Sequence, residues 1–157
     1  MRKATAATDD LEDLPGHYIR RMQQIAVAIF LEETEAFGIT PVQFAALHTV
    51  SQQPGLDQRT LAATIGFDTS TIGGVIDRLE KRELVLRNAS PDDRRVRCLT
   101  LTAEGEQLLK KIIPPMLKAQ QRMLAPLPAA DRARFMQMLR VLVQANNELS
   151  RAPREAI

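Results

Sequence analysis

Two short stretches of the chain hold residue types that can bind a nucleic acid. Residues 68–74 contain three hydroxyl side chains and two adjacent glycines, namely Thr69, Ser70, Thr71, Gly73 and Gly74. Residues 90–97 read SPDDRRVR, a turn by composition that carries Arg94 and Arg95. Hydroxyl groups hydrogen-bond to phosphates and base edges, and arginine at a loop tip suits the narrow minor groove of DNA, where the negative potential is enhanced. Both stretches therefore offer the chemistry of DNA recognition.

The two glycines interrupt a segment that otherwise has helical periodicity. Apolar residues predict a buried face for a helix over residues 69–81, namely Ile72, Val75, Ile76 and Leu79. Gly73 and Gly74 then lie on or beside the outward face, although each costs roughly 1 kcal/mol relative to alanine in a helix interior. Loose surface composition and close packing against another helix are two possible explanations. The functional interpretation is clearance for the backbone or base edges of another molecule.

A helix-turn-helix unit would position these residues. Asp57 is predicted to cap a short helix over residues 58–65, which ends at Gly66, and Asp68 or Thr69 caps the next helix. In this arrangement the second helix enters the major groove of DNA with its N-terminus first. Arg78, beside the outward face of that helix, joins the candidate DNA contacts.

The arginine-bearing turn joins two strand-like runs, LVLRNA and VRCLTLT, which predict a β-hairpin. Aspartates directly before the arginines would weaken a simple anion-binding loop. We therefore expect Asp93 to hold an arginine side chain in place, and Asp77 to do the same or to accept a hydrogen bond from cytosine N4. The alternative for this charged run is a solvated turn with weak surface ion pairs.

Helices are predicted on both sides of this unit. One spans about residues 15–37, and a second begins at Pro41 after a capping box of Thr40 and Gln43. A long helix begins after Thr102, and Pro114-Pro115 should kink or interrupt it. The last helix starts near Pro128. Its predicted buried stripe consists of Phe135, Met138, Leu139, Leu142 and Leu149.

Composition and missing motifs argue against several functions. The chain of 157 residues has a net charge of only +2, with two histidines and one cysteine. It has no P-loop, no H-E-x-x-H and no Cys/His metal spacing, so we expect no enzyme, no cofactor and no metal site. A signal sequence and a membrane-spanning run are also missing, which predicts a cytoplasmic protein without a membrane partner. Cys98, expected to be buried on a strand, leaves a redox-sensing repressor as an alternative.

The stretch IDRLEKRELVLRNASPDDRRVRCLTLTAEG, residues 76–105, resembles the signature of the MarR family of bacterial winged helix-turn-helix regulators. The family pattern runs DRLEKRGLV, then a P-x-D-R-R wing, then LT-x-x-G. Glu83 stands where the family usually has a glycine that ends the recognition helix in a left-handed turn. We therefore expect this helix end to be shaped differently here.

The resemblance implies a mainly α fold with two functional parts. Residues 39–101 would form a winged helix-turn-helix domain with a two-stranded β-wing. Residues 14–38 and 102–150 would form a helical dimerisation region, with a disordered tail over 1–13 and a flexible tail over 151–157. A homodimer would bind a near-palindromic double-stranded operator, most often as a repressor. A winged-helix protein-interaction module without DNA binding is the other alternative.

The segments GHYIRRMQQIAVAIFLEE and GITPVQFAALHTV look most like family members that control the catabolism of aromatic acids. That resemblance implies an effector such as a hydroxybenzoate or hydroxynicotinate, which releases the DNA. Its pocket would need a cation or donor among apolar walls. The candidates are His17, Arg20, Arg21 and His48, and a satisfied core histidine is an equally good interpretation of His48.

Overall fold

The computed structural model describes residues 10–150, so the expected tails over residues 1–9 and 151–157 lie outside the described residues. Residues Leu11–Asp13 form a short 3-10 turn, η1, in which the backbone N–H of Glu12 donates to Asp10 Oδ1 at 3.1 Å. This part of the N-terminal tail is thus folded, in contrast to the expectation of disorder up to residue 13.

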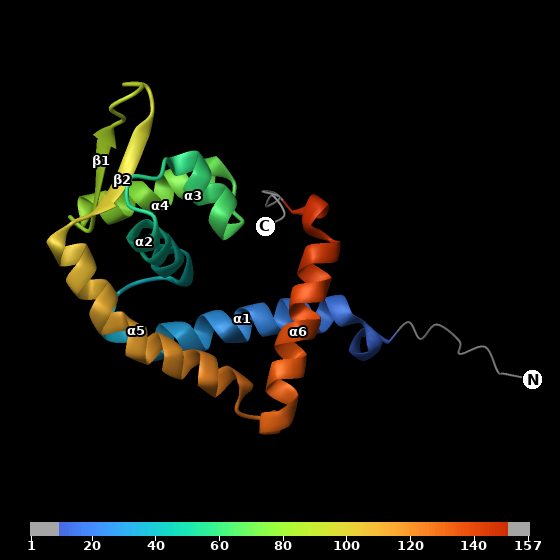
Figure 1. Cartoon of the computed structure of the whole chain (residues 1–157). Helices are drawn as coiled ribbons and strands as arrows, with labels where there is room; N and C mark the ends of the chain where they lie inside the picture. The colour runs from blue at the N-terminus through green and yellow to red at the C-terminus, as the bar shows by residue number, and fades with distance from the viewer. Residues whose placement is uncertain (1–9, 151–157) are drawn as a thin grey trace, which may run out of the picture.

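The described residues form a mainly helical chain with one antiparallel hairpin (Figure 1). In chain order the elements are α1 (Pro15–Glu33), η2 (Glu35–Phe37), α2 (Pro41–Gln52), α3 (Gln58–Ile65), α4 (Thr69–Lys81), β1 (Val85–Ala89), β2 (Arg97–Leu101), α5 (Ala103–Leu124), α6 (Ala129–Ala145) and η3 (Asn147–Leu149). The predicted fold class is therefore confirmed.

Local sequence signals set most helix starts. Thr40 and Gln43 form the expected reciprocal capping box at the start of α2. Asp57, Asp68 and Thr102 accept hydrogen bonds from the first turns of α3, α4 and α5. A side-chain oxygen at the N-cap satisfies a backbone N–H that has no partner within the helix, so these residues fix where each helix begins.

The core lies where α2, α3 and α4 pack against the hairpin and the first half of α5. All four apolar residues predicted for the inner face of α4 are buried. The loop before α3 also pairs with β2, because Gly55 N–H donates to Leu99 O at 2.8 Å and Leu99 N–H donates to Leu56 O at 2.9 Å. This pairing, which periodicity did not predict, fixes the hairpin against the helix-turn-helix unit.

The end of α4 keeps the geometry of a glycine terminus although Glu83 occupies the position. Glu83 has φ of +57°, and Leu84 N–H donates to Leu79 O at 3.0 Å while Glu83 N–H donates to Glu80 O at 2.9 Å. These two bonds define a Schellman motif. The expectation of a differently shaped helix end is wrong, because the surrounding bonds hold glutamate in a left-handed conformation.

Glu83→Gly should consequently stabilise the protein. A non-glycine residue in this conformation stores roughly 1–2 kcal/mol of strain, part of which the greater freedom of glycine in the unfolded chain offsets. We expect a net gain of about 1 kcal/mol, which raises the melting temperature by roughly 2–4 °C for a domain of this size. Thermal denaturation followed by circular dichroism measures the shift. Glu83→Ala keeps a Cβ and is the matched control, so an equal gain there would contradict the strain argument.

Helix α5 is continuous through Pro114 and Pro115, and its axis bends near the middle (Figure 1), which is the first of the two predicted outcomes, a kink or an interruption. Helices α1 and α5 pack along each other. Lys118 Nζ lies 2.8 Å from Glu33 Oε2, and Arg122 Nη1 lies 2.7 Å from Glu32 Oε2. The hydrogen bond from Lys118, with help from Arg122, lowers the pKa of the Glu33 carboxyl.

Helix α6 extends away from the core (Figure 1), and none of its side chains is buried within the chain. The expected buried stripe is therefore absent from the single chain. Met138, Leu139 and Leu142 are exposed, Phe135 is half-buried, and Leu149 of η3 is 84% exposed. The helical period was right, but the part of the chain that the structure describes supplies no surface to cover the stripe.

Candidate nucleic-acid interface

The first turn of α4 carries three hydroxyl side chains, of which one takes part in the helix cap. Thr71 Oγ1 donates to Asp68 Oδ2 at 2.7 Å, and Thr71 N–H donates to Asp68 Oδ1 at 2.8 Å. The Thr71 hydroxyl is thus part of the helix cap. Thr69 and Ser70 are exposed at the same helix end, which leaves them as the better placed pair for a ligand.

The glycines of α4 are not sealed inside the chain, since both are partly exposed. A Cβ on Gly73 would lie 3.1 Å from Gln58 Nε2 of α3, tighter than an ordinary contact. This contact is with the tip of a flexible side chain, which can shift by a few tenths of an ångström, so packing against α3 does not by itself require glycine at position 73. A Cβ on Gly74 would meet only the Arg78 guanidinium, at 3.8 Å. No intramolecular contact requires glycine at position 74.

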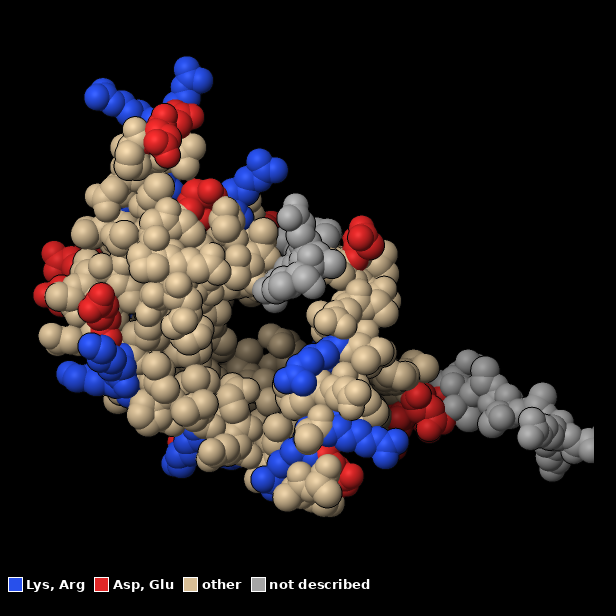
Figure 2. Space-filling model, viewed as in Figure 1, with Lys and Arg blue, Asp and Glu red and all other residues tan. Residues whose placement is uncertain are grey.

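The hairpin carries its two arginines at an exposed tip. Figure 2 shows basic side chains extending beyond this wing, with acidic side chains directly behind them. Arg94 and Arg95 are exposed, and Asp93 Oδ1 accepts a hydrogen bond from the backbone N–H of Arg95 at 2.9 Å. Asp93 thus shapes the main chain of the turn. The expected grip on an arginine side chain is replaced by this backbone contact.

Asp77 does hold an arginine, but from β1 and not from the wing tip. Arg87 Nη2 lies 2.6 Å from Asp77 Oδ1, and Arg87 Nη1 donates to Glu80 Oε2 at 3.0 Å. The sequence pattern did not lead us to predict a role for Arg87. Alternation along β1 could have revealed it, because Arg87 shares a sheet face with buried Val85, and a charge on an inward face needs partners.

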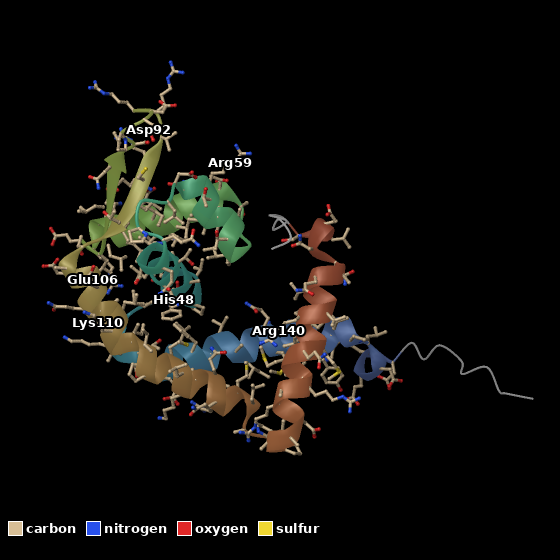
Figure 3. All side chains as sticks on the ribbon, in the orientation of Figure 1. His48, Arg59, Asp92, Glu106, Lys110 and Arg140 are labelled. Carbon is tan, nitrogen blue, oxygen red and sulfur yellow. The ribbon has the colours of Figure 1, made fainter. Side chains whose placement is uncertain are left out.

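A second missed residue is Arg59 on α3. It is exposed, and Figure 3 shows its side chain on the side of the molecule to which the wing, labelled at Asp92, also extends. The first helix of a helix-turn-helix crosses the DNA backbone, so a cation near its start was an available signal.

Of the candidate ligand residues, His17, Arg20 and Arg21 lie near the start of α1, whereas His48 lies on α2. His48 on α2 is exposed and stacks on Phe44, with ring centroids 5.7 Å apart and planes inclined by 14°. The alternative of a core histidine is therefore wrong. His17 packs edge-on against Tyr18 at 5.4 Å near the start of α1, where Arg20 is exposed. Figure 1 places the start of α1 at the end remote from α2, so one chain does not bring them together.

Residues 10–150 contain no group of three His, Cys, Asp or Glu side chains arranged to hold a metal ion. Within the same range, no helix combines the length and hydrophobicity needed to cross a membrane. Cys98 is a free, half-buried thiol on β2, less enclosed than expected.

The arrangement of α2, α3, α4 and the hairpin defines a DNA-binding winged helix-turn-helix protein. The MarR family model matches residues 39–96 of the chain. The putative transcriptional regulatory protein for the hcr operon of Thauera aromatica is 33% identical to this chain, over 89% of this chain and 85% of its own length. This chain belongs to the MarR family of transcriptional regulators.

Two solved structures are similar over nearly their whole length. PcaV from Streptomyces coelicolor, in complex with its natural ligand, is 34% identical with a TM-score of 0.79, over 89% of this chain and 99% of PcaV. BpsR from Bordetella bronchiseptica, whose DNA binding is regulated by 6-hydroxynicotinic acid, is 29% identical with a TM-score of 0.82. The similarity covers 87% of this chain and 97% of BpsR. These relatives are transcriptional regulators and not enzymes.

Proposed function

We propose that the chain is a homodimeric repressor that binds a near-palindromic operator and releases it when a small aromatic carboxylate binds. One observation carries the DNA-binding part. Arg59 of α3 and the wing, labelled at Asp92, lie on one side of the molecule (Figure 3), and Thr69 and Ser70 are exposed at the start of α4. A duplex that received α4 in its major groove would meet the wing in the adjacent minor groove.

Each part of this surface has a separate task in the proposal. Ser70 and Thr69 contact base edges and phosphates, and the start of α4 adds backbone donors and a favourable dipole for phosphate. Gly74 keeps the approach to the groove open, with Arg78 beside it. Arg94 and Arg95 enter the minor groove, and Arg59 binds a phosphate.

The homodimer rests on uncovered apolar surface at the two ends of the chain. Exposed large apolar residues occur along the first half of α1 and along α6, namely Tyr18, Ile19, Met22, Ile25, Met138, Leu139, Val141, Leu142 and Val143. A monomer rarely exposes so much apolar surface, and a two-fold axis lets the same patch cover itself. Two winged units would then face half-sites about one helical turn apart.

The effector part rests on an aromatic stack and on the relatives. Phe30, Phe44 and His48 form a series of ring contacts, with Phe30 and Phe44 centroids 6.0 Å apart and His48 at the exposed end. Such a stack suits a planar ring, and Arg20 can bind a carboxylate in bidentate fashion. Because His17 and Arg20 lie on the exposed part of α1, a second copy would have to complete the pocket. Regulation of BpsR by 6-hydroxynicotinic acid supports an effector of this class.

The test combines a gel shift with a thermal-shift screen. We expect the wild-type protein to bind duplex DNA from its own upstream region, with an affinity that falls steeply as salt increases, because cations released from phosphates drive binding. A hydroxybenzoate or hydroxynicotinate should raise the melting temperature and release that DNA. Salt-independent binding, or no duplex binding at all, would contradict the proposal. His48→Ala should abolish the response to the acid while DNA binding persists.

A further inference from the structure

We propose that Arg87 is a positioning residue for operator binding, which fixes the wing against α4 and offsets part of the negative charge of two carboxylates that would otherwise repel the DNA. The inference deepens the proposed function and rests on it. No DNA contact is assigned to Arg87 itself.

The first argument is geometric. Arg87 lies on β1, directly before the wing turn, and its guanidinium contacts three points of α4. Nη2 lies 2.6 Å from Asp77 Oδ1 and donates to Gly73 O at 3.3 Å, while Nη1 donates to Glu80 Oε2 at 3.0 Å. Positions 73, 77 and 80 follow the i, i+4, i+7 spacing of one helix face. A single planar group therefore joins the wing strand to two turns of the recognition helix.

The second argument is electrostatic. The Asp77 side chain is 57% exposed and the Glu80 side chain 40% exposed, whereas that of Arg87 is 22% exposed. Without Arg87, two unpaired carboxylates would remain on the helix that approaches a polyanion. With Arg87 in place, its charge offsets one of the two carboxylates and its hydrogen bonds occupy an oxygen of each. Asp77 is consequently a partner of Arg87, in place of the cytosine acceptor considered from the sequence.

The residue type fits this task. Arginine offers five N–H donors in a rigid planar fork, so that it can serve several acceptors at once. Lysine carries the same charge on a flexible chain without that fork. We therefore expect Arg87→Lys to restore only part of the function lost in Arg87→Met.

The test measures operator affinity in two backgrounds. In the native background, Arg87→Met should weaken binding about tenfold, within the range for coupled side chains in one ion-pair network. In an Asp77→Asn, Glu80→Gln background, which has no carboxylates to leave unpaired, the same change should weaken binding less than about threefold. The slope of affinity against salt should stay the same, because no phosphate contact is removed.

Arg122→Met is the matched control, since Arg122 also lies between two carboxylates, Glu32 and Glu33, but on α5 away from the wing. It should leave operator affinity unchanged. If Arg87→Met weakens binding equally in both backgrounds and lowers the salt slope by about one, Arg87 binds a phosphate directly and the inference is overturned. Unchanged affinity with a lower melting temperature would reduce Arg87 to a stabilising residue and would also overturn it.

A measurement on the free protein separates this inference from the proposed function. NMR order parameters of wing residues 90–96 should fall in Arg87→Met and stay unchanged in Arg122→Met. If the wild-type protein binds no duplex, the proposed function fails, whereas these order parameters still decide whether Arg87 positions the wing. An equally rigid wing in Arg87→Met would overturn the positioning role.

Discussion

Gly105→Ala is expected to destabilise the fold by about 3 kcal/mol, at the upper end of the usual effect of overpacking. A Cβ at position 105 would fall on the carbonyl oxygen of Leu84. That oxygen cannot move away freely, because it accepts a hydrogen bond from Thr102 N–H at 3.1 Å. Thr102 in turn caps α5 and donates through Oγ1 to Glu83 O at 2.6 Å. The glycine therefore lets α5 start directly against the end of the recognition helix.

Thermal denaturation at fixed protein concentration measures this effect, and we expect the melting temperature to fall by roughly 6–12 °C. Gly74→Ala is the matched control, because it makes the same change inside a helix where a Cβ meets only an ordinary contact. It should stabilise α4 by up to about 1 kcal/mol. Equal effects at the two positions would show that close approach of Leu84 is not what requires glycine. If Gly74 provides clearance for DNA, the same variant should also weaken operator binding.

Simultaneous replacement of Arg94 and Arg95 by alanine is expected to weaken DNA binding about 30-fold to 1,000-fold, from roughly 1–2 kcal/mol for each arginine. Both side chains are exposed at the wing tip, where they make no ion pair within residues 10–150 that could compete with phosphates. For the same reason their loss should leave the melting temperature unchanged. Binding should weaken across many sequences, and the salt dependence should become shallower by about one for each phosphate contact removed.

Fluorescence anisotropy with the operator and with a scrambled duplex, at several salt concentrations, measures both effects. Ser70→Ala is the contrasting variant, since a hydroxyl near base edges contributes to sequence preference more than to overall charge. We expect Ser70→Ala to reduce the difference in affinity between the operator and the scrambled duplex. The dependence of affinity on salt concentration should stay almost unchanged. Full affinity in the double arginine variant would remove the wing from the proposed interface.

Most helix starts and the helix-turn-helix unit were readable from the sequence because they depend on neighbours within one or two turns. The predicted end of the first helix near residue 37 was wrong, since α1 ends at Glu33. The caps at Thr40, Asp57, Asp68 and Thr102 are confirmed, and so is the buried face of α4. The wing hairpin also followed from local pattern, since its turn composition and flanking strands are contiguous. The family resemblance in residues 76–105 agreed with these elements.

Where sequence reasoning failed, a distant part of the chain decided the outcome. Glu83 adopts a left-handed conformation, and its carbonyl oxygen accepts a hydrogen bond from Thr102 Oγ1, 19 residues further along the chain. Asp77 pairs with Arg87 across the boundary between helix and strand, which no spacing rule within one element predicts.

The sequence by itself determined which segments are helices, where they start, and that the start of α4 and the wing carry side chains suited to DNA. Short-range hydrogen bonds and periodicity fix these features, and both can be read along the chain. Only the tertiary structure decided that Leu84 meets Gly105, that Arg87 joins the wing to α4, and that no other segment within residues 10–150 covers the apolar face of α6. These outcomes depend on which surfaces meet after folding, and a one-dimensional pattern carries no information about that.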